Sequence, residues 1–324
     1  MGRYLVTGGA GFIGSHLSRE LLSEDNEVVC LDNFDPFYDP QIKLNNIESF
    51  NKNLNFCLER GDIRDSDFLE KVFKKYQFDQ VVHLAARAGV RPSLKNPLLY
   101  EDVNIKGTLN ILECLKKYQV KKLIFGSSSS VYGTNKKVPF SEDDLIQKTI
   151  SPYAVTKLAG EMFCHSYSHL YNISIVCLRF FTVYGPAQRP EMAIHKFTDA
   201  IFKDKKISLY GDGSSQRDYT FISDIVAGIK ASMENEFSFE IFNLGNSSTI
   251  KLKDLIATIE RVSGKRAKIE WLEMQPGDVP ITYASIDKSK RLLGFDPKVD
   301  ITTGINIFIE WYQQNIAAGK NFLK

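Results

Sequence analysis

The sequence predicts an α/β protein in which a doubly wound parallel sheet is followed by a smaller, mixed α/β C-terminal lobe. Two observations lead to this fold class. Over the first 183 residues, short runs of Val, Ile, Leu and Phe alternate with helical patterns. Such alternation is typical of βαβ units, whose parallel sheet is covered by helices on both faces. After about residue 183 the alternation weakens, so we expect the second lobe to be built differently.

Six buried strands are expected in the first part. Each is a short apolar run that ends in turn-forming residues, which is the pattern of a strand inside a parallel sheet. The runs are RYLVTGG (3–9), EVVCLDNF (27–34), LNFCLERGDI (54–63), QVVHLAARA (80–88), KKLIFGSSSS (121–130) and ISIVCLRFF (173–181).

Helical patterns lie between these runs and continue, less regularly, in the second lobe. In the first part they are IGSHLSRELLSE (13–24), DFLEKVFKKY (67–76), VNIKGTLNILECLKKY (103–118) and PYAVTKLAGEMFCHSYSHLY (152–171). In the second lobe we expect helices over 193–204, 251–264 and 305–315, with Gly264 as a helix C-cap. The segment 207–213 predicts a strand and a turn, and EIFNLGN (240–246) predicts a strand that rejoins the main sheet.

The composition excludes several classes of function. A net charge of +2 gives no strong field for nucleic acid or a membrane surface. No apolar span is long enough to cross a bilayer, and the N-terminus runs directly into a strand, so we expect a cytoplasmic protein. The cysteines are odd in number and scattered without a CxxC pair, which indicates reduced thiols and no zinc site. They are Cys30, Cys57, Cys114, Cys164 and Cys177.

The histidines do not change this expectation. His165 and His169 are one helical turn apart, but no third ligand is nearby in the sequence, so we expect no metal. His83 lies inside a buried strand and is interpreted as a core histidine.

TGGAGFIG (7–14) follows the first strand and opens the first helix, which is the context of a phosphate-binding turn. Gly8 suits the tight turn, Gly11 lets the backbone approach a pyrophosphate, and Gly14 lets the helix pack closely on the strand. The helix N-terminus then faces the negative charge. The pattern predicts a Rossmann-type dinucleotide-binding domain.

Asp32 ends the second strand, 18 residues after Gly14. A carboxylate there accepts hydrogen bonds from the adenosine ribose and repels a 2′-phosphate, so NAD is favoured over NADP. The alternative is a capping aspartate at a strand-to-loop turn. Asp62 ends another strand and is a candidate contact of the adenine amino group, with a helix N-cap as the equal alternative.

Tyr153 and Lys157 in SPYAVTK lie four residues apart, on one face of a predicted helix. A lysine ammonium beside a phenol lowers the pKa of the tyrosine, which supplies a general base near neutral pH. The pattern YxxxK alone is common in ordinary helices. Four serines, Ser127 to Ser130, end the preceding strand at the same sheet edge. A serine hydroxyl there can hydrogen-bond the reacting oxygen and share its proton with the tyrosine.

Together, TGGAGFIG, LDN, GDIRD, HLAA, SSSSVYG and SPYAVTK resemble the extended short-chain dehydrogenase/reductase family of nucleotide-sugar enzymes. GDGSSQRDYTFISDI and MQPGDV in the second lobe also match that family, so the resemblance covers essentially the whole chain. It implies tightly held NAD, a UDP- or dTDP-sugar substrate, and a homodimer built from two helices of each subunit. It also implies that residues 1–183 form the NAD-binding domain and 184–324 the nucleotide-sugar-binding lobe.

The resemblance further implies roles for single residues. Ser128 is the expected catalytic serine, with Tyr153 as base and Lys157 as its partner. Arg217 matches an arginine that contacts the nucleotide phosphates, and Asp278 a loop residue near the uridine ribose. The cofactor-binding residues that we expect are Gly8, Gly11, Phe12, Ile13, Gly14, Asp32, Asn33, Asp62, Ile63, Leu84, Ala85, Ala86, Asn104, Ser127, Tyr153, Lys157 and Phe180. The expected substrate-binding residues are Arg91, Ser128, Ser129, Ser130, Tyr153, Thr182, Arg189, Arg217 and Asp278.

Several stretches are similar to one branch of the family, the UDP-glucuronate 4-epimerases. These are DPFYDPQIK (35–43), RAGVRPS (87–93) and FFTVYGPAQRPEMAIHKF (180–197). One departure is Arg87, where that branch usually has glutamine. Asn104 matches a residue that supports the lysine, directly or through water.

The implied reaction is inversion at carbon 4 of a UDP-sugar through a 4-keto intermediate, with UDP-glucuronate to UDP-galacturonate favoured. The 4-keto form of a uronic acid is a β-keto acid that can lose carbon dioxide, so an epimerase must hold the carboxylate. Arg189 is the natural candidate because its fork of donors is rigid, with help from Thr182 and the serines. A solvated arginine after a turn is the alternative interpretation of Arg189.

Three other functions stay open. UDP-glucuronate decarboxylation and 4-epimerisation of UDP-glucose or UDP-galactose are alternatives within the family, although many of those enzymes carry asparagine at the position of Thr182. A non-catalytic NAD-sensing protein on the same fold is the alternative from another class.

Overall fold

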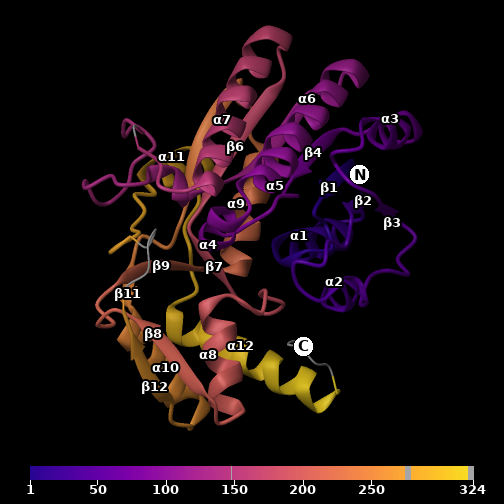
Figure 1. Cartoon of the computed structure of the whole chain (residues 1–324). Coiled ribbons are helices and arrows are strands. Elements are labelled where there is room, and N and C mark those ends of the chain that lie inside the picture. The colour runs from indigo at the N-terminus through magenta and orange to yellow at the C-terminus, as the bar shows by residue number, and fades with distance from the viewer. Residues whose placement is uncertain (147, 274–278, 320–324) are drawn as a thin grey trace.

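The structure confirms the predicted fold class (Figure 1). The computed structural model describes residues 1–146, 148–273 and 279–319. In this part of the chain the main sheet has seven strands in the order β10-β6-β5-β4-β1-β2-β3, and every neighbouring pair is parallel. The strands are β1 (Arg3–Thr7), β2 (Glu27–Asp32), β3 (Phe56–Arg60), β4 (Gln80–His83), β5 (Lys122–Ser128), β6 (Ser174–Phe180) and β10 (Phe239–Leu244).

Helices cover both faces of this sheet because its strands are apolar on both sides. In β1, Val6 belongs to a core shared with α1 (Phe12–Ser23) and α9 (Ile222–Glu234). Its neighbour Leu5 belongs to the opposite core, shared with α3 (Ser66–Lys75), α6 (Gly107–Tyr118) and α7 (Pro152–Tyr171). Successive residues of a strand point to opposite faces, so each strand contributes to two hydrophobic layers.

Several short helices in the segments that connect the strands were not predicted from the sequence. They are α2 (Pro40–Ile47), α4 (Val90–Lys95), α5 (Pro97–Glu101) and α11 (Asp287–Leu293). The predicted helix over 103–118 is divided, because a π-helical turn at Asp102–Lys106 precedes α6. A 3₁₀ turn at Ser129–Tyr132 follows β5. Helices this short depend on tertiary packing more than on their own sequence, so periodicity does not reveal them.

The described part of the second lobe contains two small sheets and three further helices. One sheet has the order β11-β9-β7, and the other pairs β12 with β8. These strands are β7 (Thr182–Tyr184), β8 (Lys206–Tyr210), β9 (Gln216–Phe221), β11 (Thr249–Lys251) and β12 (Lys268–Leu272). The helices are α8 (Ala193–Phe202), α10 (Leu252–Ser263) and α12 (Ile301–Ala317). Gly264 ends α10 in the left-handed conformation, with φ of 67°, as expected of a C-cap.

The second half of the chain also completes the first domain. β10 forms the edge of the main sheet beside β6, with Ile241 opposite Cys177. Helix α9 packs against α1 on one face of that sheet. The boundary at residues 183 and 184 stays a prediction, because segments from both sides of it share one core.

Candidate active site

One cavity of about 490 Å³ lies at the carboxyl ends of the central strands, where open α/β sheets bind ligands. It gathers most of the residues that the sequence singled out. These are Gly8, Gly11, Phe12, Ile13, Gly14, Asp32, Asn33, Asp62, Ile63, Leu84, Ala85, Ala86, Ser127, Ser128, Ser129, Ser130, Tyr153, Lys157, Phe180, Thr182 and Arg189.

The glycine-rich turn has the backbone that a dinucleotide site requires. Gly8 has a φ of +67°. A Cβ on Gly14 would lie 2.3 Å from the carbonyl oxygen of Gly8, so a side chain there would push α1 away from β1. Gly11 is the N-cap residue of α1 and has no side chain to occupy the space in front of the helix. The free amides of the helix start therefore face the cavity, which favours a phosphate.

Asp32 is buried and has one carboxylate oxygen available for a ligand. Its Oδ1 accepts hydrogen bonds from Lys43 Nζ at 2.8 Å and from the Phe34 amide at 2.9 Å. Its Oδ2 has no hydrogen-bond partner among the described residues. A buried acceptor without a partner is unfavourable, and a ribose hydroxyl would satisfy it. The residues present therefore fit NAD, with Asp32 holding the adenosine ribose.

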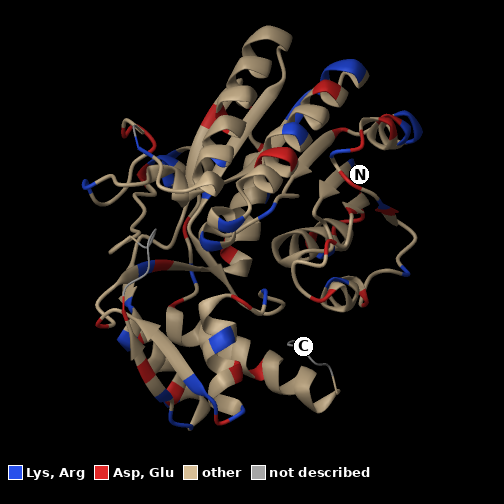
Figure 2. Ribbon diagram, in the orientation of Figure 1, with Lys and Arg blue, Asp and Glu red and all other residues tan. Residues whose placement is uncertain are grey.

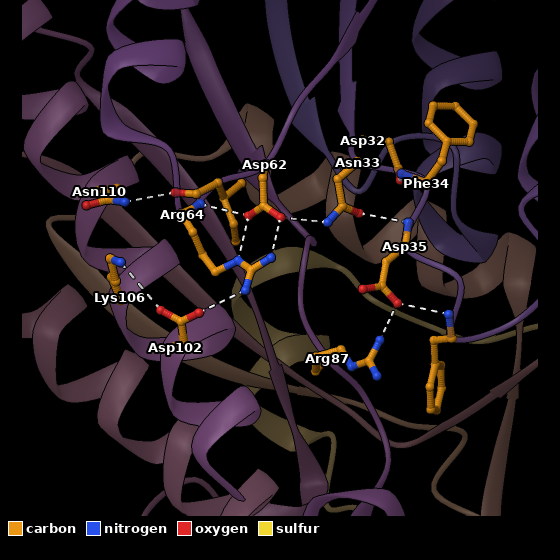
Figure 3. A network of polar contacts seen from close by, with 12 residues as sticks. Asp32, Asn33, Phe34, Asp35, Asp62, Arg64, Arg87, Asp102, Lys106 and Asn110 are labelled. Carbon is orange, nitrogen blue, oxygen red and sulfur yellow. Dashed lines mark hydrogen bonds and ion pairs between the residues drawn. The ribbon is translucent and has the colours of Figure 1, made fainter. Parts of the chain in front are cut away.

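Asp62 belongs to a polar network that joins the loops after β2 and β3 (Figure 3). It accepts two hydrogen bonds from the Arg64 guanidinium at 3.0 and 2.8 Å, one from the Arg64 amide and one from Asn33. Burial raises the pKa of Asp62, but the bonds from Arg64 and Asn33 outweigh it and lower the pKa to about 2. The helix N-cap role falls to Asp65, which accepts from the Phe68 amide. Contact with adenine stays a prediction, since four bonds already occupy most of the acceptor sites of Asp62.

Tyr153 lies in the first turn of α7, which begins after the N-cap Ser151. Burial raises the pKa of the Tyr153 phenol, while a hydrogen bond with Ser128 and the charge of Arg189 lower it. Lys157 Nζ donates to the Gly126 carbonyl at 2.6 Å, and burial lowers the pKa of this lysine to about 8. The sequence analysis assigned the stabilising charge to Lys157. The charge of Arg189 lowers the pKa of the Tyr153 phenol, and Lys157 Nζ is bound to the backbone of β5, so the role of Lys157 as partner of the base stays a prediction.

Neighbouring serines at the end of β5 bond different partners. Ser128 caps the 3₁₀ turn, accepts from the Ser130 amide at 3.2 Å, and bonds Tyr153. Ser127 donates to Glu161 at 2.5 Å, and Glu161 pairs with Arg179 at 2.8 Å in the buried interior. The structure therefore favours Ser128 as the serine beside the base, as predicted. The hydroxyl of Ser127 is engaged in the core.

Thr182 and Arg189 lie on the wall of the same cavity, from β7 and the turn that follows it. Arg189 Nε lies 3.0 Å from Glu191 Oε1. The Arg189 side chain is 22% exposed and lines the cavity, so most of it is covered by the protein, and its contact with substrate stays a prediction.

Four predicted residues do not line the cavity or cannot be placed. Asn104 donates to the Arg87 carbonyl and to Thr156, both at 3.0 Å, and accepts from the Arg87 amide. It thus supports a cavity loop and α7, and has no direct bond to Lys157 in the described structure. Arg91 of α4 stacks on Tyr210 of the second lobe. Arg217 lies in the second lobe itself, on β9, and its Nη1 donates to the Gln216 carbonyl. Asp278 lies outside the described residues, and the roles of all four stay predictions.

Sequence reasoning missed several residues of the cavity wall, among them Tyr38, Lys43, Val90 and Met192. Tyr38 and Lys43 belong to the segment 35–43, which was noted only for its similarity to one branch. That segment folds over the cofactor end of the cavity, and Lys43 lies 5.6 Å from the centre of the Tyr38 ring. The available signal was a lysine eleven residues after Asp32, the predicted ribose-binding aspartate.

The remaining side-chain expectations can be compared with the described residues. His83 is a satisfied core histidine: its ring nitrogens lie 2.7 Å from Thr7 Oγ1 and 3.1 Å from Thr108 Oγ1. Burial lowers its pKa to about 3. The five cysteines are free thiols. Within the described ranges, no helix combines the length and apolar character needed to cross a bilayer.

Comparison with known proteins places this site in a family. The profile of the GDP-mannose 4,6 dehydratase family matches residues 5–308. The chain belongs to this family, within the extended short-chain dehydrogenases/reductases. The resemblance stated from the motifs is therefore confirmed.

Relatives of this family match over nearly full length. UDP-glucuronate 4-epimerase of Thermodesulfobacterium geofontis is 43% identical, over 98% of this chain and 98% of the relative. The crystal structure of UDP-glucuronic acid 4-epimerase from Bacillus cereus, with UDP-glucuronic acid and NAD, superposes with a TM-score of 0.91 at 40% identity, over 96% of this chain and 99% of that one. UDP-glucose 4-epimerase of Thermotoga maritima, with UDP-glucose, gives 0.89 at 31% identity, over 97% and 99%.

Proposed function

We propose that this extended short-chain dehydrogenase/reductase is an NAD-dependent UDP-glucuronate 4-epimerase that forms UDP-galacturonate. The observation that carries the proposal is one cavity with a guanidinium, Arg189, next to a buried phenol, Tyr153. The relatives named UDP-glucuronate 4-epimerase support the epimerase class. NAD is the cofactor of the solved neighbours, and it fits the open oxygen of Asp32.

Tyr153 takes the proton of the sugar 4-hydroxyl and later returns it to the same oxygen, after carbon 4 has been reduced on its opposite face. NAD, when bound, supplies the hydride acceptor and donor for that carbon. Ser128 holds the reacting oxygen through its hydroxyl and stabilises the deprotonated phenol by the hydrogen bond that lowers the pKa of Tyr153. Between the two proton transfers the 4-keto sugar turns about its phosphate linkage, so inversion occurs with no net oxidation.

Arg189 restrains the carboxylate of this keto sugar. Loss of carbon dioxide requires the breaking bond to align with the π system of the ketone, and a guanidinium that grips both carboxylate oxygens prevents that rotation. Glu191 supports the assignment, because its carboxylate is already bound by Arg189 Nε at 3.0 Å. Thr182 lies on the same wall and can donate from its hydroxyl.

The test is incubation of the purified protein with UDP-glucuronate, followed by separation of UDP-galacturonate from UDP-xylose by mass and retention time. UDP-galacturonate supports the proposal. UDP-xylose with carbon dioxide would assign the protein as a decarboxylase, and turnover of UDP-galactose alone would assign a neutral-sugar epimerase, as the Thermotoga maritima neighbour suggests. No turnover of any UDP-sugar would favour the NAD-sensing alternative.

We also propose a homodimer that forms through α7. This helix has two charged residues, Lys157 and Glu161, and both are buried. Figure 2 shows the ribbon of α7 mostly tan, whereas α3 and α6 carry several blue and red segments. Val155, Met162 and Leu170 lie on one stripe of α7 and are 50%, 58% and 65% exposed. A second copy that presents the same stripe would bury it. Met162→Glu should then give a monomer in light scattering.

The described thiols suit a reducing compartment, so we place the enzyme in the cytoplasm.

A further inference from the structure

The turn between β7 and α8 carries Arg189 on a backbone that its surroundings must fix. Gly185 has a φ of +140°, and Ala187 has a φ of +64°. A Cβ on Gly185 would lie 2.6 Å from Ile222 Cγ2. A residue other than glycine in the left-handed region persists only where neighbouring groups hold it there. The contacts that hold this turn therefore decide where the Arg189 guanidinium lies.

His16 contacts the turn from the side of the cofactor. It lies on α1, one helical turn after the helix begins at the glycine-rich loop, and its Nε2 is 2.9 Å from the carbonyl oxygen of Pro186. A carbonyl oxygen only accepts, so His16 Nε2 carries the proton and donates. Burial lowers the pKa of His16 to about 4, so the donor is a neutral imidazole at physiological pH. The Phe12 ring packs edge-on against it at 5.9 Å.

His195 contacts the same turn from the second lobe. It lies on α8 with no exposed surface, and its Nδ1 is 2.7 Å from the carbonyl oxygen of Gln188. By the same argument Nδ1 is the protonated nitrogen. The Gln188 side chain is itself buried and donates to the Val183 carbonyl at 3.3 Å, at the end of β7. The residue directly before Arg189 is thus bonded through both its main chain and its side chain.

We propose that His16 and His195 are positioning residues that hold the Arg189 turn from opposite sides, so that the guanidinium meets the substrate carboxylate. The Pro186 and Gln188 carbonyls bracket Ala187, the residue with positive φ, and each is taken by one imidazole. His16 also joins the helix that binds the cofactor pyrophosphate to the turn that binds the sugar. The role for the carboxylate rests on the proposed function, whereas the fixing of the turn does not.

This arrangement makes the two histidines matter for a charged sugar more than for a neutral one. If the imidazole donor of either histidine is lost, the turn can adopt more conformations. Arg189 then no longer contacts the carboxylate in one fixed position. Small displacements of a positioning group can reduce turnover by about a hundredfold. Neither histidine lines the cavity that holds the glycine-rich turn, Tyr153 and Ser128, so NAD content should stay unchanged.

Paired variants test the proposal. His16→Phe and His195→Phe keep a ring and remove the donor. His16→Gln places an amide where Nε2 was, and His195→Asn places one where Nδ1 was, so these two should restore the bond. His165→Phe on α7 is a matched control. For each protein we would measure KM and kcat with UDP-glucuronate, the share of UDP-xylose among the products, bound NAD, and amide hydrogen exchange of residues 185–192.

We expect both Phe variants to raise exchange in 185–192, to raise KM for UDP-glucuronate by about tenfold or more and to raise the UDP-xylose share, with bound NAD unchanged. The Gln and Asn variants should return towards wild type. Unchanged exchange in 185–192 would overturn the proposal, and so would raised exchange with unchanged KM and products. If wild type itself does not use UDP-glucuronate, the proposed substrate falls, and the exchange data alone decide whether the histidines hold the turn.

Discussion

Glu191 Oε1 lies 3.0 Å from Arg189 Nε, so the guanidinium assigned to the substrate carboxylate already holds a carboxylate of its own chain. The two side chains are 22% and 40% exposed. An ion pair this accessible contributes about 0.2–1 kcal/mol. We therefore expect Glu191 to compete only weakly with a uronic acid for Arg189.

Glu191→Gln should lower KM for UDP-glucuronate by up to about fivefold, because 1 kcal/mol corresponds to that factor in binding. KM for a neutral UDP-sugar should not change. The measurement is a pair of saturation curves at low salt, with Glu273→Gln as a control acidic change. A higher KM for the uronic acid would show instead that Glu191 is needed to orient Arg189.

Ser128→Ala should move the rise of kcat/KM with pH to higher pH. The hydrogen bond from Ser128 lowers the pKa of Tyr153, which burial raises, so its removal leaves less phenolate at a given pH. Tyr153→Phe should reduce turnover by about 10²–10⁴-fold at every pH, since it removes the base.

Ser127→Ala is the matched control for Ser128→Ala. Its hydroxyl donates to Glu161, so we expect lower thermal stability without displacement of the pH profile. Equal profiles for the two serine variants would contradict the assignment of Ser128.

Lys157→Met should stabilise the protein at pH 7 while it abolishes turnover. Burial lowers the pKa of Lys157 to about 8, against an ordinary value of 10.5. Between these two pKa values the unfolded chain binds a proton that the folded protein lacks, so the free energy of unfolding of the wild type rises with pH. Below pH 8 the folded protein must bury the charged ammonium, and the loss of stability is then complete. The shift corresponds to about 3 kcal/mol, offset by about 1 kcal/mol for the lost bond to Gly126.

Urea unfolding at pH 7 and pH 10 measures this effect. The variant should exceed the wild type in free energy of unfolding by about 2 kcal/mol at pH 7, and the difference should shrink at pH 10. A difference that grows with pH would refute a lowered lysine pKa.

Arg87→Gln should weaken retention of NAD. Arg87 forms an ion pair with Asp35 and stacks on Phe37 at 4.7 Å, which joins the loop after β4 to the loop after β2 at the cofactor end of the cavity (Figure 3). Asn104 bonds the main-chain amide and carbonyl of Arg87, so the backbone that carries the Arg87 side chain is held in place. We expect NAD to be released several-fold faster. The release is measured from absorbance ratios that are recorded during dilution of the protein. Asp35→Asn should speed NAD release to a similar extent. The variant with both substitutions should release NAD little faster than either single variant.

The sequence could predict features that depend on neighbouring residues. The turn at Gly8 and Gly14, the helix start at Ser151 and the apolar strands are local patterns, and the carboxyl ends of parallel strands meet at one edge in this fold class. Tyr153, Ser128 and Asp32, which the sequence singled out, therefore line one cavity, and their roles stay predictions.

What could not be predicted are bonds between residues that are distant in the chain. His16 and Pro186 are 170 residues apart, and neither belongs to a pattern that names the other. The same holds for Lys122, whose ammonium reaches the Met233 carbonyl at 2.7 Å. The bond from the Lys157 ammonium to the Gly126 carbonyl at 2.6 Å was not predicted either, because the two residues are 31 apart in the chain.

The position of β10 limits how this protein can be divided for study. A fragment that stops at residue 183 would keep every residue of the glycine-rich turn, Tyr153 and Lys157, yet it would lack the strand that pairs with β6 from Ile175 to Phe180. The bare edge of β6, rich in Ile, Val, Cys and Leu, is the kind of strand that associates with other chains. Expression of the cofactor-binding half alone should therefore yield aggregates, and a soluble minimal unit must extend past Leu244.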